Sequence, residues 1–185
     1  MLMNEKVPDI VFDSVVGGHR ERIKLSSYRG KYLLLFFYPA NFSFASPQEI
    51  CLPSGLSEEL RLLNSHLIGI STEHVECLSK YQDSLIGPKE VRIVSDPFFQ
   101  IFETFGILEN DRKKNGFRAL AIIDPKGRML SIEKNYGQFG FDMNDVWEKF
   151  KESLKCQECG GKIVEEVIQG EKTRQYCEDC QLLRI

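Results

Sequence analysis

The sequence of 185 residues lacks long hydrophobic runs, a large excess of either charge, and internal repeats. No stretch approaches the ~20 apolar residues that a membrane-spanning helix needs, and residues 1–13 lack the apolar core of a signal peptide. With 24 Lys and Arg against 27 Asp and Glu, the net charge of -3 gives no bulk attraction to nucleic acid or to an anionic membrane. We therefore expect a cytoplasmic protein without membrane or nucleic-acid partners.

Cysteine is scarce in the body of the chain and crowded at its end. Cys51 and Cys77 precede residue 155, whereas the other four of the six cysteines form two C-x-x-C pairs in the last thirty residues. In a chain without a secretory signal, this clustering favours a metal site over disulfides. The segment after residue 154 is too short to own a hydrophobic core. The sequence therefore predicts one domain over 1–154 and a small one over 155–185.

Strand and helix patterns alternate along the first domain. KYLLLFFY (31–38) is a continuous apolar run, typical of a strand that is buried on both faces of a sheet. The patterns predict a mixed α/β sheet with helices on both faces. Further strands are expected over 66–71 and 91–96, hairpins over 9–25 and 118–133, and helices over 46–64 (with a break near Pro53 and Gly55), 74–84, 97–106 and 144–154.

Residues 36–51, FFYPANFSFASPQEIC, carry an apolar strand through a proline into a helix start at Ser46. Ser46, Pro47 and Glu49 form a capping box, so the serine has a sufficient structural role in holding the helix end. A helix start after a central strand also lies at the carboxyl edge of the sheet, where open α/β sheets place their sites. The positive end of the helix would lower the pKa of a thiol there and make it reactive.

This segment resembles the active-site segment of the peroxiredoxins, the alkyl hydroperoxide reductase and thiol-specific antioxidant family. That segment has the form P-x-x-x-T/S-x-x-C, and Pro39, Ser43 and Ser46 occupy its three key positions. The similarity continues in matching order through IGISTE, VSDPF, FGI and GFRALAIIDPKGRML, and covers roughly residues 7–154. The resemblance implies a thioredoxin-like α/β fold and a thiol peroxidase lineage.

The resemblance also implies roles for individual residues. Pro39 would shield the reacting atom, and the hydroxyl of Ser43 would help to orient the peroxide. Arg118 would stabilise the thiolate and the transition state, and Glu49 would hold that arginine in place. Peroxide or a small thiol-linked substrate, a thiol reductant protein, and a homodimer or larger assembly are the partners that the family implies.

Ser46 stands where the family has its peroxide-attacking cysteine. Peroxide reduction needs a thiolate that becomes a sulfenic acid and is then resolved by a second thiol. A serine hydroxyl ionises far less readily and has no comparable redox chemistry, so the chain as written should not reduce peroxide at position 46. Two explanations fit: an engineered substitution, or a natural member that kept the scaffold and lost or changed the activity.

The other body cysteines and the histidines suggest structural roles. Cys51 lies at a spacing from position 46 that some peroxiredoxins use for a resolving cysteine, but a buried, inert role is favoured. Cys51 cannot replace the nucleophile, because five residues along a helix turn it about 140° away and move it ~7.5 Å along the axis. Cys77 is expected to be an inert helix residue. His66 and His74 show no ligand pattern, and His19 is expected in a solvated turn.

The carboxyl-terminal segment has the pattern C-x2-C-x17-C-x2-C. Two such turns present four sulfurs to one tetrahedral ion, with strands 162–168 and 173–176 joined by a glycine turn. The segment resembles a rubredoxin-like zinc ribbon. Zinc is favoured over iron, and two redox-active dithiols are the third interpretation. The predicted ligands are Cys156, Cys159, Cys177 and Cys180.

Three functions are therefore open. The first is a peroxiredoxin-lineage protein, inactive as written, with its pocket at Pro39, Ser43 and Arg118. The second is a non-enzymatic redox-sensing or binding module that uses the zinc ribbon. The third is an electron-transfer protein with iron in the ribbon. A nucleic-acid role for the ribbon is not favoured, because the segment is acidic.

Overall fold

The computed structural model describes residues 4–39, 60–84, 91–108, 118–134, 143–154, 163–168, 172–177 and 183–184. The chain divides into two compact units, Met1–Val146 and Trp147–Ile185, and the boundary lies within helix α5 (Met143–Ser153). The domain boundary expected at residue 155 stays a prediction. Within the described ranges, no helix is long and apolar enough to cross a membrane.

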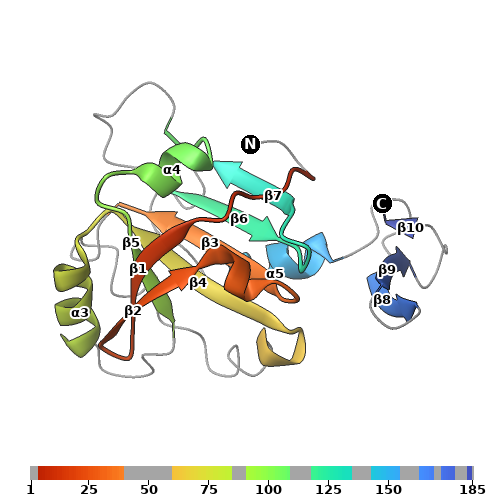
Figure 1. Ribbon diagram of the computed structural model, residues 1–185, viewed down its shortest axis with the longest axis horizontal. Helices are drawn as coiled ribbons and strands as arrows, with labels where there is room; N and C mark the ends of the chain where they lie inside the picture. Colours follow the sequence, from red (N-terminus) through yellow and green to blue (C-terminus); the bar gives the residue numbers. More distant parts are fainter. Residues whose placement is uncertain are drawn as a thin grey trace. The chain divides into compact units, whose positions relative to one another are not determined.

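The described residues of the first unit form a seven-stranded mixed sheet in the order β2-β1-β5-β4-β3-β6-β7 (Figure 1). Strands β3, β4 and β5 are parallel, and the outer strands join them through antiparallel pairs. This confirms the predicted mixed α/β sheet and its two hairpins. The strands are β1 (Val11–Val16), β2 (His19–Lys24), β3 (Tyr32–Tyr38), β4 (Ser65–Ser71), β5 (Arg92–Ser95), β6 (Ala119–Ile123) and β7 (Met129–Lys134).

Strand β3 lies inside this sheet, between β4 and β6. Leu33 and the five residues that follow it are all buried. A central strand covered on both faces needs no polar alternation, which explains the apolar run in the sequence. Its last pair with β4 joins Tyr38 to Ser71, so the chain leaves the sheet immediately before Pro39.

Gly69 on β4 allows two aromatic rings of β3 to lie close to the neighbouring strand. The rings of Phe36 and Tyr38 are stacked, with 5.5 Å between their centroids and 16° between their planes. A Cβ atom at Gly69 would lie 2.9 Å from a ring carbon of Phe36 and 3.0 Å from one of Tyr38. Any larger residue would therefore displace the ring that immediately precedes Pro39.

Helix α3 (Val75–Ser84) contacts β1, β2 and β5. Gln82 is buried on this helix, and its amide nitrogen lies 2.9 Å from the carbonyl oxygen of Val91 and 3.3 Å from that of Val15. Its side-chain oxygen accepts a hydrogen bond of 3.1 Å from the backbone N–H of Gly18. One buried amide thus joins the helix to the β1–β2 hairpin and to the start of β5.

The helix expected over 97–106 is shorter than predicted: α4 covers only Gln100–Thr104. Phe99 has a φ of +60°, in the left-handed region, so the helix cannot begin before it. Phe102 is fully buried, and its ring meets that of Phe37 edge-on at 5.1 Å. The short 3-10 helix η1 (Leu25–Tyr28) connects β2 to β3.

The second unit contains a small antiparallel sheet, whose described residues form three strands in the order β10-β9-β8. Strands β8 (Ile163–Ile168) and β9 (Lys172–Cys177) pair as the predicted hairpin, and Ile163 lies opposite Cys177. Strand β10 (Leu183–Arg184) pairs with β9 next to this end, where Leu183 lies opposite Tyr176.

Candidate active site

Pro39 and Arg118, two of the predicted site residues, lie at the same edge of the sheet. Ala119 pairs with Phe37 across the antiparallel β3–β6 ladder. Arg118, the residue before Ala119, therefore lies opposite Tyr38, at the end of β3. Arg118 is 6% exposed. A guanidinium group is rarely buried unless other groups satisfy it, so a buried arginine beside this strand end marks a specialised position.

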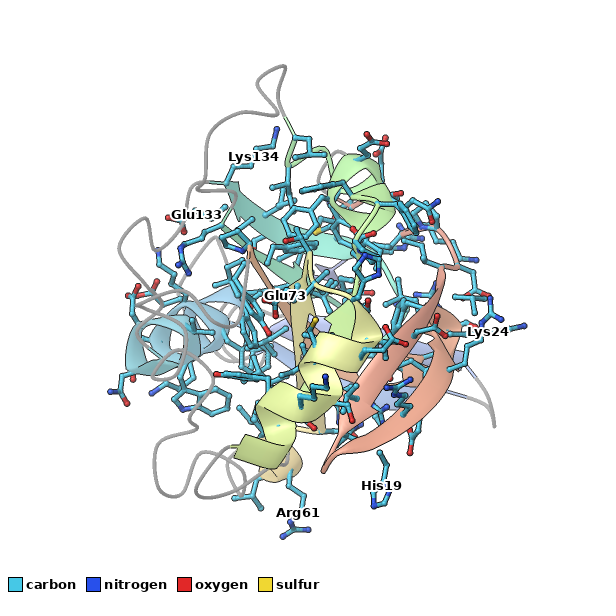
Figure 2. All side chains as sticks on the ribbon, turned by 90° about the vertical axis from the view of Figure 1, so that its left-hand side faces the viewer. His19, Lys24, Arg61, Glu73, Glu133 and Lys134 are labelled. Atoms are coloured by element: carbon cyan, nitrogen blue, oxygen red, sulfur yellow. The ribbon has the colours of Figure 1, made fainter. Side chains whose placement is uncertain are left out.

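The carboxyl ends of β3, β4 and β5 meet at this edge, as expected for parallel strands in an α/β sheet. Glu73 follows β4, and Glu133 and Lys134 end β7, whose register brings them toward the same edge. Figure 2 shows these three side chains above His19 and Arg61, which lie at the lower end of the view. Pro39 and Arg118 therefore lie at one defined end of the sheet.

Thr72 joins the end of β4 to the end of β3. Its hydroxyl group donates a hydrogen bond to the carbonyl oxygen of Pro39. Because Ser71 and Tyr38 form the last pair of the parallel ladder, Thr72 and Pro39 are also next to each other in register. This residue was missed from the sequence. Alignment of the ends of β3 and β4 as parallel neighbours could have identified it, because such an alignment places Thr72 opposite Pro39.

Asp96 fixes the next strand end and the start of α4. One carboxylate oxygen accepts the backbone N–H of Gln100 at 2.8 Å, and the other accepts those of Ile101 at 2.8 Å and Phe102 at 3.0 Å. Its own N–H donates to the carbonyl oxygen of Ser71 at 2.7 Å. Burial raises the pKa of Asp96, against the three N–H donors, which lower it. The carboxyl edge is thus held mainly by bonds to backbone groups.

A cavity of about 280 Å³ lies beside the Asp96 turn. Val11, His74 and Phe98 are among its lining residues, and Phe98 is 73% exposed. The rings of His74 and Phe98 meet edge-on at 6.2 Å. Among the described residues of the predicted site, neither Pro39 nor Arg118 lines this cavity.

The remaining predicted site residues lie outside the described residues or have no described side chain. The first group comprises Ser43, Ser46, Glu49, Cys51, Cys156, Cys159 and Cys180. Cys177 ends β9, where its backbone alone is described. Cys77 is exposed on α3 with a free thiol. Within the described part of the chain, no group of three or more metal-ligating side chains comes together.

Comparisons with known proteins give the same assignment as the motif. A model of the AhpC/TSA family matches residues 3–132. Peroxiredoxin-2 of Mus musculus is 34% identical over 138 residues, which cover 72% of this chain and 69% of that protein. Peroxiredoxin-1 of Gekko japonicus is 39% identical over 135 residues, which cover 69% of this chain and 67% of that protein.

Solved structures extend the likeness to the fold. The crystal structure of Enterococcus faecalis AhpC covers 88% of this chain and 98% of its own, with a TM-score of 0.74 and 28% identity. The Plasmodium vivax 2-Cys peroxiredoxin, at 22% identity and a TM-score of 0.70, covers 80% of this chain and 94% of its own. The residues matched by the family model run from before β1 into β7, and so include both Pro39 and Arg118.

Proposed function

Because this chain belongs to the AhpC/TSA family, we propose that its carboxyl-edge site retains the peroxide pocket of that family, with Ser46 at the position of the reacting sulfur. The observation that carries this proposal is the buried Arg118 beside the end of β3, next to Pro39. A fixed cation at this point favours an anionic nucleophile and the negative charge that develops on the peroxide. Ser43 and Glu49 complete the proposed pocket.

The chemistry explains why position 46 decides the activity. A thiolate attacks one peroxide oxygen, so that a sulfur–oxygen bond forms and the oxygen–oxygen bond breaks. The departing oxygen takes a proton, and the sulfur becomes a sulfenic acid. A second thiol then reduces the sulfenic acid, which yields a disulfide and water. Serine cannot follow this sequence, so the chain as given does not reduce peroxide at this position.

The test is hydrogen peroxide consumption by the Ser46→Cys protein with dithiothreitol, measured against the chain as given. Turnover in the cysteine form alone is the expected result. The matched control is Arg118→Met in the Ser46→Cys protein, which should lower the peroxide rate by ~10²-fold, the usual effect of removing one stabilising group. Absence of turnover in every form would refute the proposed pocket.

For the second unit, we propose a structural zinc ion on Cys156, Cys159, Cys177 and Cys180. The β8–β9 register supports this, because Ile163, the first residue of β8, lies opposite Cys177, the last residue of β9. Four thiolates suit a tetrahedral ion, and a segment this small depends on the metal for folding.

Elemental analysis of the purified protein should find one zinc per chain. A red, visibly absorbing preparation would instead indicate iron and favour electron transfer.

The assembly and cellular setting are further parts of the proposal. We expect a homodimer or larger assembly in the cytoplasm, with a thiol reductant protein as the electron donor to the cysteine form. Light scattering of the purified protein tests the assembly. A monomer at micromolar concentration would contradict it.

A further inference from the structure

The edge between β3 and β4 contains a contact that the proposed pocket does not yet use. The parallel ladder ends at Tyr38 and Ser71, so Pro39 and Thr72 are the first residues beyond it. Pro39 has no backbone N–H, and its backbone therefore offers a single group, the carbonyl, through which hydrogen bonds can hold it. The hydroxyl of Thr72 donates to that carbonyl.

Thr72 is itself held by its neighbours on both sides. The carbonyl of Ser71 accepts the N–H of Asp96 at 2.7 Å, and the hydroxyl of Ser71 accepts the N–H of Glu73 at 3.2 Å. The hydroxyl of Ser95 donates to the carbonyl of Glu73 at 2.7 Å. The segment that carries Thr72 is thus tied to the end of β5, and through Asp96 to α4.

We propose that Thr72 is a positioning residue that links this rigid strand-end network to Pro39 and so sets where the chain leaves β3 toward position 46. The inference rests on the proposed function, in which Pro39 shields the reacting atom. Thr72 does not touch the peroxide in this proposal. Its effect passes through the carbonyl of Pro39.

The first test examines the contact in the chain as given, without reference to activity. Thr72→Val keeps the shape of the side chain and removes the hydroxyl, whereas Thr72→Ser retains it. The ¹³C carbonyl resonance of Pro39 should move in Thr72→Val and return in Thr72→Ser. Thr104→Val is the matched control, because the Thr104 hydroxyl donates to the carbonyl of Gln100 at 2.7 Å within α4, in an exposed hydrogen bond. An unmoved Pro39 resonance in Thr72→Val would overturn the inference.

The second test measures the rate of the Ser46→Cys protein with hydrogen peroxide in a single turnover. Adding Thr72→Val should lower the rate about fivefold, the factor expected for one net hydrogen bond, whereas Thr72→Ser and Thr104→Val should leave it near the parent rate. Equal rates for Thr72→Val and its parent, or a Thr72→Ser rate as low as that of Thr72→Val, would refute the positioning role. Failure of Ser46→Cys itself would refute the proposed function, and the Pro39 resonance would still decide the contact.

Discussion

The two ends of the parallel strands satisfy their polar groups in different ways. At the carboxyl ends, Asp96 and Thr72 bond to backbone groups of α4 and of Pro39. At the amino ends, Gln82 also bonds to backbone groups, but titratable side chains bond to one another as well: Lys31 Nζ lies 3.0 Å from His66 Nε2. A backbone N–H keeps its hydrogen at every ordinary pH, whereas a contact between titratable side chains depends on their charge.

A second side-chain pair adds to the amino end. Arg92 Nη1 lies 2.7 Å from the Glu21 carboxylate and 2.9 Å from the Ser14 hydroxyl oxygen. The rings of Tyr28 and His66 meet edge-on, with 5.3 Å between their centroids. The amino end is thus a cluster of charged and titratable groups. At the carboxyl end, where the proposed site lies, Asp96 and Thr72 bond instead to backbone groups, and Asp96 is the titratable partner in these bonds.

The largest effect that distinguishes the two ends is expected at Asp96. Asp96→Ala leaves three backbone N–H groups without their acceptor and should lower the free energy of unfolding by about 3 kcal/mol. Asp96→Asn keeps one acceptor oxygen and should lose less. Urea denaturation with a constant m-value measures the difference. A loss below about 1 kcal/mol for Asp96→Ala would show that water replaces the carboxylate and that this end is not rigid.

A smaller loss is expected at Gly69, where the rings of Phe36 and Tyr38 leave no room for a Cβ atom. Gly69→Ala should cost about 2 kcal/mol of unfolding free energy through overpacking. It should also alter the near-ultraviolet circular dichroism of Tyr38, the residue before Pro39. Phe36→Leu in the same chain provides space and should recover part of the loss. A full loss in the double variant would contradict the steric explanation.

The sequence predicted the fold wherever local pattern and tertiary burial agree. The apolar run of β3 and the hairpins follow from patterning and turn residues. The start of α4 could not be predicted, because it is set by the turn before the helix, where Phe99 takes a left-handed conformation and the side chain of Asp96 caps the helix. Both features depend on packing around the turn. The apolar pattern of the segment alone fits a helix that starts earlier, at residue 97.

The family motif predicted part of the candidate site. Pro39 and Arg118 were found through a family pattern, and the strand register brings them to one edge. Thr72 was not found, because its contact joins residues that are 33 positions apart and depends on the alignment of two strand ends. His66 was expected to be structural, and its contact with Lys31 spans 35 positions. The roles of Ser43, Ser46, Glu49 and Cys51 stay predictions, since these residues lie outside the described ranges.

The smallest effect is expected at the amino end, as a dependence of stability on pH. Burial, with help from the charges of Lys31 and Arg92, lowers the pKa of His66 from its ordinary value of 6.5. The unfolded chain therefore takes up a proton near pH 6.5 while the folded chain resists it. The free energy of unfolding should fall as the pH drops below about 6.5, and this contribution should be fully present above that value.

The His66→Gln variant tests this contribution. Denaturation at about pH 7.5 and about pH 5.5 should show a smaller pH-dependent loss in His66→Gln than in the parent. His19→Gln, on the exposed start of β2, is the matched control and should keep the parental loss. Lys31→Met removes a neighbouring charge and should raise the pKa of His66, which reduces the loss in part. Equal losses in His66→Gln and the parent would show that the amino end is no more sensitive to pH than the carboxyl end, and the contrast between the two ends would fail.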